Sequence, residues 1–166
     1  MGLMMMKGEK RMGMDELMMD IEQVPVVKFE KIRDDAYAPV RAHESDSGYD
    51  ICIPYSLHLK PNEVQLVNTG IRIELPSGFE CQVRSRSGMP VKHRVVFALG
   101  VGTIDQDYRG EIKVPLWNIG ESRITLPEGA RIAQLVFSRI DRIRLTEAPV
   151  STDTERGEGG FGSTGL

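Results

Sequence analysis

The hydrophobic positions of this chain follow the two-residue period of β-strands from about residue 24 until the pattern stops at Glu147. In the segment IRIEL, residues 71–75, three apolar side chains alternate with two charged ones, which predicts a strand with one buried face. Further segments share this strand character: VVKFEKI (26–32), FECQVRS (79–85), RVVFALG (94–100), EIKVPLWNI (111–119), RITL (123–126) and RIAQLVFSRI (131–140). The pattern predicts no long amphipathic helix in this region.

Turn sequences rich in Pro, Gly, Asn and Ser separate these segments: LKPNE, LPSG, IGES and LPEG. Strands at such short and even spacing are typical of an all-β sandwich, jelly roll or barrel. We therefore expect one all-β domain over residues 24–148. An N-terminal extension (1–23) would precede it, and a mobile glycine-rich C-terminal arm (149–166) would follow.

The N-terminal extension is rich in methionine, but Lys and Glu residues interrupt any apolar run of the kind that a signal peptide needs. Its segment MDELMMDIE, residues 14–22, could form a short amphipathic helix that docks on a partner. The alternative is a flexible terminus, which is common at the ends of domains.

Composition narrows the class of protein further. The chain has 166 residues, of which 40% are hydrophobic and 27% charged, as expected for one globular domain. The net charge of -3 argues against broad binding of nucleic acid or acidic membranes, but leaves room for a small basic pocket. Cys52 and Cys81 lack metal-type spacing, which favours reduced core cysteines in an intracellular protein. No stretch of about 20 apolar residues predicts a transmembrane span.

The C-terminal arm contains a formal match to a dinucleotide-binding fingerprint at Gly157, Gly159 and Gly162. That fingerprint requires a preceding strand and a following helix, and the pattern predicts neither here. Closely spaced glycines can also hold an anion with their backbone N–H groups. Further donors and a stacking surface accompany them in Arg156, Ser163, Thr164 and Phe161. Composition alone leaves a phosphate-binding arm and a disordered linker equally open.

Four earlier stretches carry candidate chemistry. In VRSRSGM, residues 83–89, Arg84 and Arg86 alternate on an extended chain and would point to one side. With Ser87 and Gly88 they suit a phosphate, whereas the alternative is a surface pair bonded to nearby carboxylates. In RIAQLVF, residues 131–137, Gln134 is a lone amide that either satisfies its hydrogen bonds in the core or contacts a ligand.

The remaining two stretches place carboxylates beside turns. GTIDQDYRGEI, residues 102–112, predicts a tight hairpin in which Asp105 is a candidate general base and Tyr108 a candidate pocket wall. An ordinary acidic turn is the alternative. SDSGYDICI, residues 45–53, puts Asp50 at a strand start, either as a turn residue or as a carboxylate for Mg²⁺.

In this order, SDSGYDICI, RSRSGM, GTIDQDYRGEI, RIAQLVF and RGEGGFGSTG closely resemble the five ordered motifs of the homotrimeric dUTPases. The resemblance spans roughly residues 25 to 165. It implies a jelly-roll-like fold and a homotrimer with shared active sites. It also implies Mg²⁺-dependent hydrolysis of the small molecule dUTP to dUMP and pyrophosphate. The expected location is intracellular, in the cytoplasm or, for a eukaryotic or viral source, the nucleus, with no direct nucleic-acid or membrane partner.

By matching position, the resemblance assigns Asp105 to activating the attacking water and Asp50 to orienting the waters of Mg²⁺. Tyr108 would pack under the deoxyribose. The phosphate ligands would be Arg86, Ser87, Gly88 and Gln134. The hairpin that would hold uracil against its backbone includes Leu99, Gly102, Thr103, Ile104 and Lys113. The arm, closing over a neighbouring copy, would bring Arg156, Phe161, Gly162, Ser163 and Thr164, with Phe161 stacked on the uracil.

This chain departs from the family pattern at Leu99, where many relatives carry an Asn that helps to hold uracil. Met89 is a milder change, and Arg94 replaces a glycine. Two competing functions remain. A dCTP deaminase shares the fold, but typically has Ser-Ser after the arginine of the second motif, where this chain has Ser87-Gly88. A non-catalytic nucleotide-sensing or partner-binding protein would be expected to lack Asp105 or the arm, and this chain has both.

Overall fold

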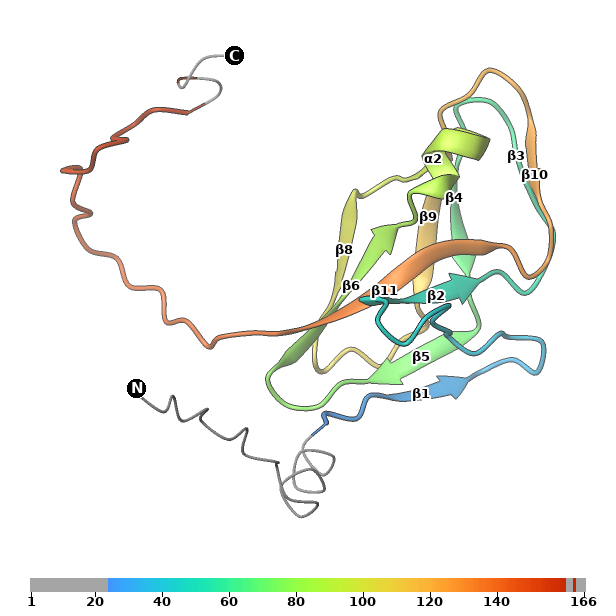
Figure 1. Ribbon diagram of the computed structural model, residues 1–166, viewed down its shortest axis with the longest axis horizontal. Helices are drawn as coiled ribbons and strands as arrows, with labels where there is room; N and C mark the ends of the chain where they lie inside the picture. Colours follow the sequence, from blue (N-terminus) through green and yellow to red (C-terminus); the bar gives the residue numbers. More distant parts are fainter. Residues whose placement is uncertain (1–23, 161–162, 164–166) are drawn as a thin grey trace, which may run out of the picture.

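The computed structural model describes residues 24–160 and 163. This part of the chain consists of antiparallel strands, one short helix and long connections (Figure 1). The elements are β1 (Lys28–Lys31), β2 (Gly48–Cys52), β3 (Leu57–Leu59), β4 (Val64–Asn68), β5 (Ile71–Glu74), β6 (Phe79–Ser85), α2 (Gly88–His93), β7 (Val95–Phe97), β8 (Val101–Ile104), β9 (Lys113–Asn118), β10 (Ile124–Leu126) and β11 (Arg131–Arg139).

The strands form two larger sheets and two strand pairs. The four-stranded sheet has the order β2-β11-β6-β8, and the three-stranded sheet has the order β4-β9-β7. The pairs are β1 with β5 and β3 with β10, and every pairing is antiparallel. This is the all-β fold that the hydrophobic pattern predicts, in the jelly-roll-like form that the resemblance implies. β11 lies at the centre of the four-stranded sheet, so its residues reach both neighbouring strands.

One hydrophobic core lies between the sheets. The predicted IRIEL strand behaves as expected, since its apolar side chains are buried and Arg72 and Glu74 are exposed. The largest fully buried apolar side chains are Ile51, Ile53, Leu59, Ile71, Ile112, Leu116, Ile132 and Leu135. Both cysteines are free thiols in buried positions, as predicted. Burial raises the pKa of Cys81 to about 12, which keeps this thiol protonated and unreactive at neutral pH.

A buried amide joins three segments at one end of the molecule. Asn118, at the end of β9, is fully buried and donates through Nδ2 to the carbonyls of Leu59, Lys60 and Ser122 at 2.9–3.2 Å. Its Oδ1 accepts the Gly120 N–H at 2.9 Å. Because both ends of the amide are satisfied, it fixes the β9–β10 turn against the end of β3.

The last strand ends at Arg139, so residues 140–148 of the predicted β domain lie beyond the sheets. Residues 140–160 form no helix or strand and run away from the body of the molecule (Figure 1). The predicted extension at 1–23 lies outside the described residues. Within the described ranges, no helix is long and apolar enough to cross a membrane.

Candidate active site

The predicted site residues other than those of the C-terminal arm gather in two surface pockets. The first, called here the polar pocket, measures about 290 Å³ and is lined by Ala42, Asp46, Ser47, Gly48, Asp50, Arg86, Ser87, Gly88, Arg131 and Gln134. The second, the loop pocket, measures about 240 Å³ and is lined by Val83, Phe97, Leu99, Gly102, Thr103, Ile104, Asp105, Tyr108, Glu111, Ile112 and Lys113. The two sets of lining residues do not overlap, so one copy of the chain presents them as separate pockets.

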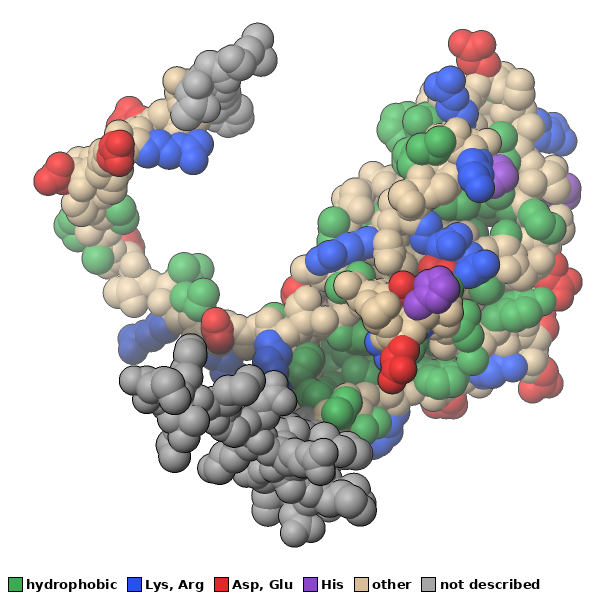
Figure 2. Space-filling model, in the orientation of Figure 1, with side chains coloured by type: hydrophobic (Ala, Val, Ile, Leu, Met, Phe, Trp, Pro, Cys, Tyr) green, Lys and Arg blue, Asp and Glu red, His purple; other side chains and the backbone are tan. Residues whose placement is uncertain are grey.

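Residues on or next to three strands build the polar pocket. Asp50 comes from β2, Arg131 from β11, and Arg86 follows the last residue of β6. The Arg86 Nε lies 2.7 Å from one Asp50 oxygen, and the Arg131 Nη1 lies 3.1 Å from the other. A guanidinium group has five N–H donors, so both arginines keep further donors for an anion. Lys and Arg side chains gather over this part of the molecule, where β2 and β11 lie (Figure 2).

Arg131 is a pocket residue that the sequence reasoning missed. It lies within the quoted RIAQLVF stretch, but an arginine at the start of a strand carries no signal of its own. Its role becomes visible only through its partner Asp50, which is distant in sequence and adjacent across the sheet.

The side chain of Gln134 packs against Gly48 in the same pocket. Its Nε2 donates to the carbonyl oxygen of Ser85 at 3.1 Å. A Cβ added at Gly48 would lie 2.4 Å from the Gln134 Oε1, so only glycine leaves room for this side chain. Gln134 is therefore hydrogen-bonded within the protein and also lines the pocket, while its contact with a ligand stays a prediction.

The two arginines of the second motif have different surroundings. Arg86 lines the polar pocket, whereas Arg84 donates to the Gln82 Oε1 at 3.0 and 2.6 Å. Arg86 is thus paired with the Asp50 carboxylate, as the alternative expects, and its contact with phosphate stays a prediction. Arg84 is a surface arginine hydrogen-bonded to a neighbour on its own strand.

Helix α2 starts at the edge of the polar pocket. Ser87 is its N-cap residue and makes no capping hydrogen bond through its side chain. A Cβ at Gly88 would meet nothing within 4 Å, so the backbone here faces open space. Met89, only 5% exposed, anchors the first turn in the core. The hydroxyl of Ser87 and the backbone at Gly88 are thereby placed beside Arg86, as the sequence suggests.

The GTIDQDYRGEI stretch is not the tight hairpin that its turn residues predict. β8 pairs with β6 in the four-stranded sheet, and β9 pairs with β4 and β7 in the three-stranded sheet. Residues 105–112, called here the 105–112 loop, therefore connect two different sheets. The segment does contain a turn, because the Tyr108 N–H donates to the Asp105 carbonyl oxygen at 3.1 Å. The strands on either side of it, however, join different sheets.

The loop pocket lies where this connection leaves the sheets. Asp105 is exposed at the start of the loop, and Tyr108 is 45% exposed within it. Leu99 is 67% exposed at the opposite wall. A Cβ at Gly102 would lie 3.0 Å from the Phe97 ring, so backbone and aromatic ring are in close contact. All predicted members of this group line one pocket: Leu99, Gly102, Thr103, Ile104, Asp105, Tyr108 and Lys113.

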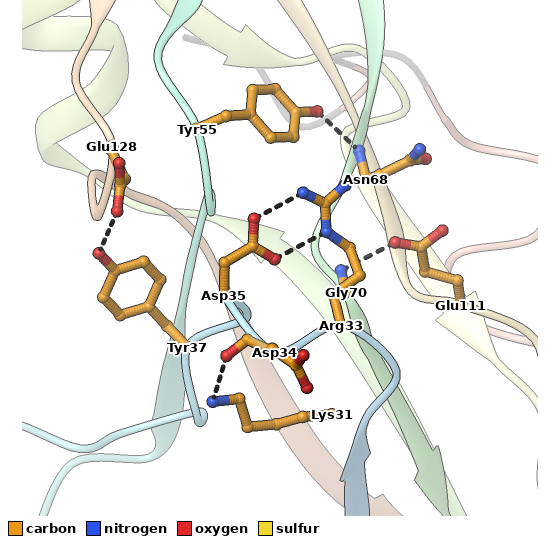
Figure 3. A network of polar contacts seen from close by, with 10 residues as sticks. All are labelled: Lys31, Arg33, Asp34, Asp35, Tyr37, Tyr55, Asn68, Gly70, Glu111 and Glu128. Atoms are coloured by element: carbon orange, nitrogen blue, oxygen red, sulfur yellow. Dashed lines mark hydrogen bonds and ion pairs between the residues drawn. The ribbon is translucent and has the colours of Figure 1, made fainter.

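A polar network holds the far end of the loop (Figure 3). The Gly70 N–H, just before β5, donates to the Glu111 Oε1 at 2.8 Å. Nearby, the Arg33 guanidinium lies 6.0 Å from the centre of the Tyr55 ring and donates to both oxygens of Asp35 at 2.8 and 2.6 Å. These hydrogen bonds lower the pKa of Asp35. Glu111 lines the loop pocket, so the network fixes one of its walls.

The described part of the arm is not at either pocket. The Arg156 Nε donates to the Gly159 carbonyl at 2.8 Å, and the Ser163 N–H donates to the Gly160 carbonyl at 3.1 Å. Neither residue lines the polar pocket or the loop pocket. The other predicted arm residues, Phe161, Gly162 and Thr164, lie outside the described residues.

Comparison with known proteins agrees with this geometry. The family model described as dUTPase matches residues 34–165. The chain belongs to the dUTPase family. The deoxyuridine 5'-triphosphate nucleotidohydrolase of Rickettsia akari (strain Hartford) is 45% identical over 150 residues, which cover 89% of this chain and 100% of that protein. The enzyme of the same name from Crocosphaera subtropica is 43% identical over 140 residues, covering 84% and 99%.

Solved dUTPase structures share the fold. The Staphylococcus bacteriophage 80alpha dUTPase, solved with dUPNHPP, superposes with a TM-score of 0.80 at 27% identity, covering 85% of this chain and 99% of that one. A mutant dUTPase from phage phi11 of S. aureus, reported with a structural Mg(II) ion, has a TM-score of 0.70 at 23% identity, covering 76% and 98%. At that identity the second structure supports the fold alone.

Proposed function

We propose that this protein is a dUTP diphosphatase, which hydrolyses dUTP to dUMP and pyrophosphate by attack of water on the α-phosphate. The observation that carries the proposal is the pair of pockets. One presents Arg86, Ser87, Gly88 and Gln134, and the other presents Asp105 beside Tyr108, on the fold of a dUTPase-family chain. In a cell, this reaction limits uracil incorporation into DNA and supplies dUMP for thymidylate synthesis.

The polar pocket suits the triphosphate. Hydrolysis of a phosphoanhydride depends mainly on charge neutralisation and alignment, which guanidinium groups and backbone N–H groups provide. We assign Arg86, Ser87, Gly88 and Gln134 to the phosphates. Arg131 holds the second oxygen of Asp50, which keeps that carboxylate facing Arg86.

The loop pocket suits the nucleoside. We assign the backbone from Leu99 to Ile104 to the edge of uracil, and the ring of Tyr108 to the deoxyribose. Backbone recognition rejects a wrong base edge because buried polar groups would stay unpaired, and such mismatches cost up to about 10⁴–10⁵ in rate. The apolar, exposed Leu99 side chain offers no hydrogen bond, so the base is read by backbone groups at that wall. Asp105 orients and deprotonates the attacking water.

The residues present fit a Mg²⁺ ion that arrives with the substrate. In the described part of the chain, no group of three His, Cys, Asp or Glu side chains could hold a metal by itself. Mg²⁺ typically keeps several waters and binds through substrate phosphates with one or two carboxylates. Asp50, in the polar pocket, would hold such an ion through its waters. When bound, Mg²⁺ neutralises charge on the phosphate oxygens.

We also propose that the protein is a homotrimer in which each active site is shared between copies. The separation of the two pockets in one chain supports this, because substrate must contact both. An apolar outer face on the three-stranded sheet supports it as well: Val64, Trp117 and Val96 lie side by side in register, and Leu66 lies beside Pro115. Exposed apolar patches of this kind mark protein interfaces.

The C-terminal arm completes the proposed site. Extending away from its own body, it would close over another copy as a lid that excludes bulk water. Its phosphate ligands would be Arg156, Gly162, Ser163 and Thr164, and Phe161 would stack on the uracil. The buried, reduced cysteines are consistent with a cytoplasmic location.

A substrate panel tests the proposed activity. Purified protein is incubated with dUTP, dCTP, dTTP or UTP, with Mg²⁺ or with EDTA, and dUMP, pyrophosphate and ammonia are measured. We expect Mg²⁺-dependent release of dUMP and pyrophosphate from dUTP alone. Ammonia from dCTP would instead identify a deaminase, and tight dUTP binding without turnover would identify a nucleotide sensor.

The role of Asp105 is tested by Asp105→Asn. Removing the base should lower kcat by about 10²–10⁴-fold, the usual contribution of general-base catalysis. The dissociation constant for dUTP should change little, because the phosphate and base contacts remain. Asp107→Asn, an exposed carboxylate in the same loop, is the matched control and should keep wild-type kcat. Wild-type turnover in Asp105→Asn would remove the base assignment while leaving the substrate assignment intact.

A further inference from the structure

The ring of Tyr108 folds back directly over Gly110. A Cβ added at Gly110 would lie 2.3 Å from the Tyr108 hydroxyl oxygen, 2.5 Å from its Cζ and 2.9 Å from its Cε2. Contacts this short do not occur at real Cβ atoms, so any side chain at position 110 displaces the ring. Gly110 itself is not a lining residue of the loop pocket, whereas Tyr108 is. Gly110 therefore lies behind a wall of the pocket.

Lack of space for a Cβ, and not backbone conformation, explains why residue 110 is a glycine. Among the glycines with positive φ are Gly70, Gly78, Gly100, Gly129 and Gly157, and Gly110 is not one of them. An alanine could thus adopt the backbone conformation of residue 110 without left-handed strain. The atoms that it would meet are at the far end of a long side chain, so the ring can move while the loop keeps its path.

The other contacts of Tyr108 fix the ring in its present place. Its hydroxyl donates to the carbonyl oxygen of Glu111 at 3.0 Å. Glu111 is held by the Gly70 N–H, and the next residue, Ile112, accepts from the Thr69 hydroxyl at 2.7 Å and donates to Ile71. Thr69 is fully buried. The acceptor of the tyrosine hydroxyl therefore lies at the end of the 105–112 loop that is hydrogen-bonded to residues 69–71, and Gly110 lets the ring reach it.

We propose that Gly110 is a positioning residue that sets the position of the Tyr108 ring and thereby the preference for deoxyribose over ribose. The inference rests on the proposed function, in which this ring packs against the sugar. A ring held tightly against C2′ leaves no room for a ribose hydroxyl. How far the Tyr108 ring extends into the loop pocket decides whether a ribose hydroxyl is excluded. On the side away from the pocket, the ring packs against Gly110, which has no Cβ.

The test is Gly110→Ala, assayed for kcat/KM with dUTP and with UTP. If the ring swings outward, UTP gains access; if it moves into the pocket, dUTP loses access while UTP is already excluded. In both cases the dUTP to UTP ratio of kcat/KM should fall, by at least about tenfold for loss of one close steric contact. The change should appear mainly in KM, because Asp105 and the polar pocket are untouched.

A double-mutant cycle with Tyr108→Ala separates positioning from general damage to the loop. Once the ring is removed, an alanine at 110 meets no obstacle, so Gly110→Ala should have little further effect in the Tyr108→Ala background. Asp107→Ala, an exposed side chain in the same loop, is the control and should keep the wild-type ratio. If Gly110→Ala alone fails to fold, a double variant that folds and matches Tyr108→Ala supports the inference equally.

A wild-type dUTP to UTP ratio in Gly110→Ala overturns the inference, as does an effect of the same size in the Tyr108→Ala background. Either result leaves the proposed function standing, provided the wild-type protein hydrolyses dUTP. If the wild-type protein does not hydrolyse dUTP, the proposed function fails first and the inference falls with it.

Discussion

In the part of the chain that the structure describes, two residues other than glycine adopt left-handed backbone conformations. Asn62 has φ 57° and precedes β4, and Arg94 has φ 55° and caps the C-terminus of α2. Asparagine tolerates this region, because its short side chain can hydrogen-bond locally, but arginine pays the full steric penalty of its Cβ. Arg94 stands where the family pattern has glycine, which is the usual residue at this type of helix end. The substitution is therefore a source of strain in the folded protein.

We predict that Arg94→Gly stabilises the protein. Relief of the left-handed penalty, about 1–2 kcal/mol, exceeds the added backbone entropy of glycine, about 0.5–1 kcal/mol, so a gain of about 0.5–1 kcal/mol is expected. Urea unfolding at one fixed protein concentration would show a higher midpoint with an unchanged m-value. Arg94→Ala removes the same side chain but keeps the Cβ, and should give no such gain. Equal stabilisation by both variants would assign the effect to the guanidinium instead.

Single residues were predicted well where a motif carried them and poorly where only a distant partner reveals them. Arg86, Asp105 and Tyr108 were found from their motifs, and each lines a pocket. Arg131 gave no signal, because its role depends on a carboxylate across the sheet. Gly110 was interpreted only as a turn residue, because its contact with the Tyr108 ring depends on the path of that ring. The sequence records which residues are present, but not which atoms approach them.

At the scale of elements, the period of the apolar positions predicted most strands, including β5, β6, β9 and β11. It missed β3, which has only three residues, β4, which no predicted segment covers, and α2, whose single buried residue is Met89. It also misassigned the 105–112 loop as a hairpin. Turn residues indicate that a chain reverses, whereas hydrogen-bond partners decide which sheet each flanking strand joins.

We predict at this scale that the arm acts as a lid. Deleting residues 156–166 should lower kcat/KM for dUTP by at least about 10²-fold, the usual effect of removing stabilising donors from a phosphate transition state. The trimer and the unfolding temperature should not change, because residues 140–160 add no strand to either sheet. Deleting only residues 165–166, which have no assigned role, is the matched control. Full activity of the longer deletion would exclude the lid.

For the whole molecule, the arrangement of the two pockets relates assembly to catalysis. In the proposed function, a dUTP molecule needs the Arg86 side and the Asp105 side at once, yet the two pockets do not share a lining residue. The apolar outer face of the three-stranded sheet has Leu66 61% exposed and Val64 54% exposed. Burying that face between copies would join a polar pocket of one chain to a loop pocket of another, so that activity depends on assembly.

We therefore predict that Leu66→Glu abolishes activity through loss of the trimer and not through loss of the fold. A carboxylate on this face would be desolvated on association, which costs several kcal/mol per buried charge and is repeated in every copy. Light scattering should report monomers, circular dichroism should stay that of an all-β protein, and dUTP hydrolysis should fall with the trimer fraction. Thr125→Glu, exposed on β10, should stay trimeric and active. An active Leu66→Glu monomer would mean that one chain can bring both pockets to the substrate unaided.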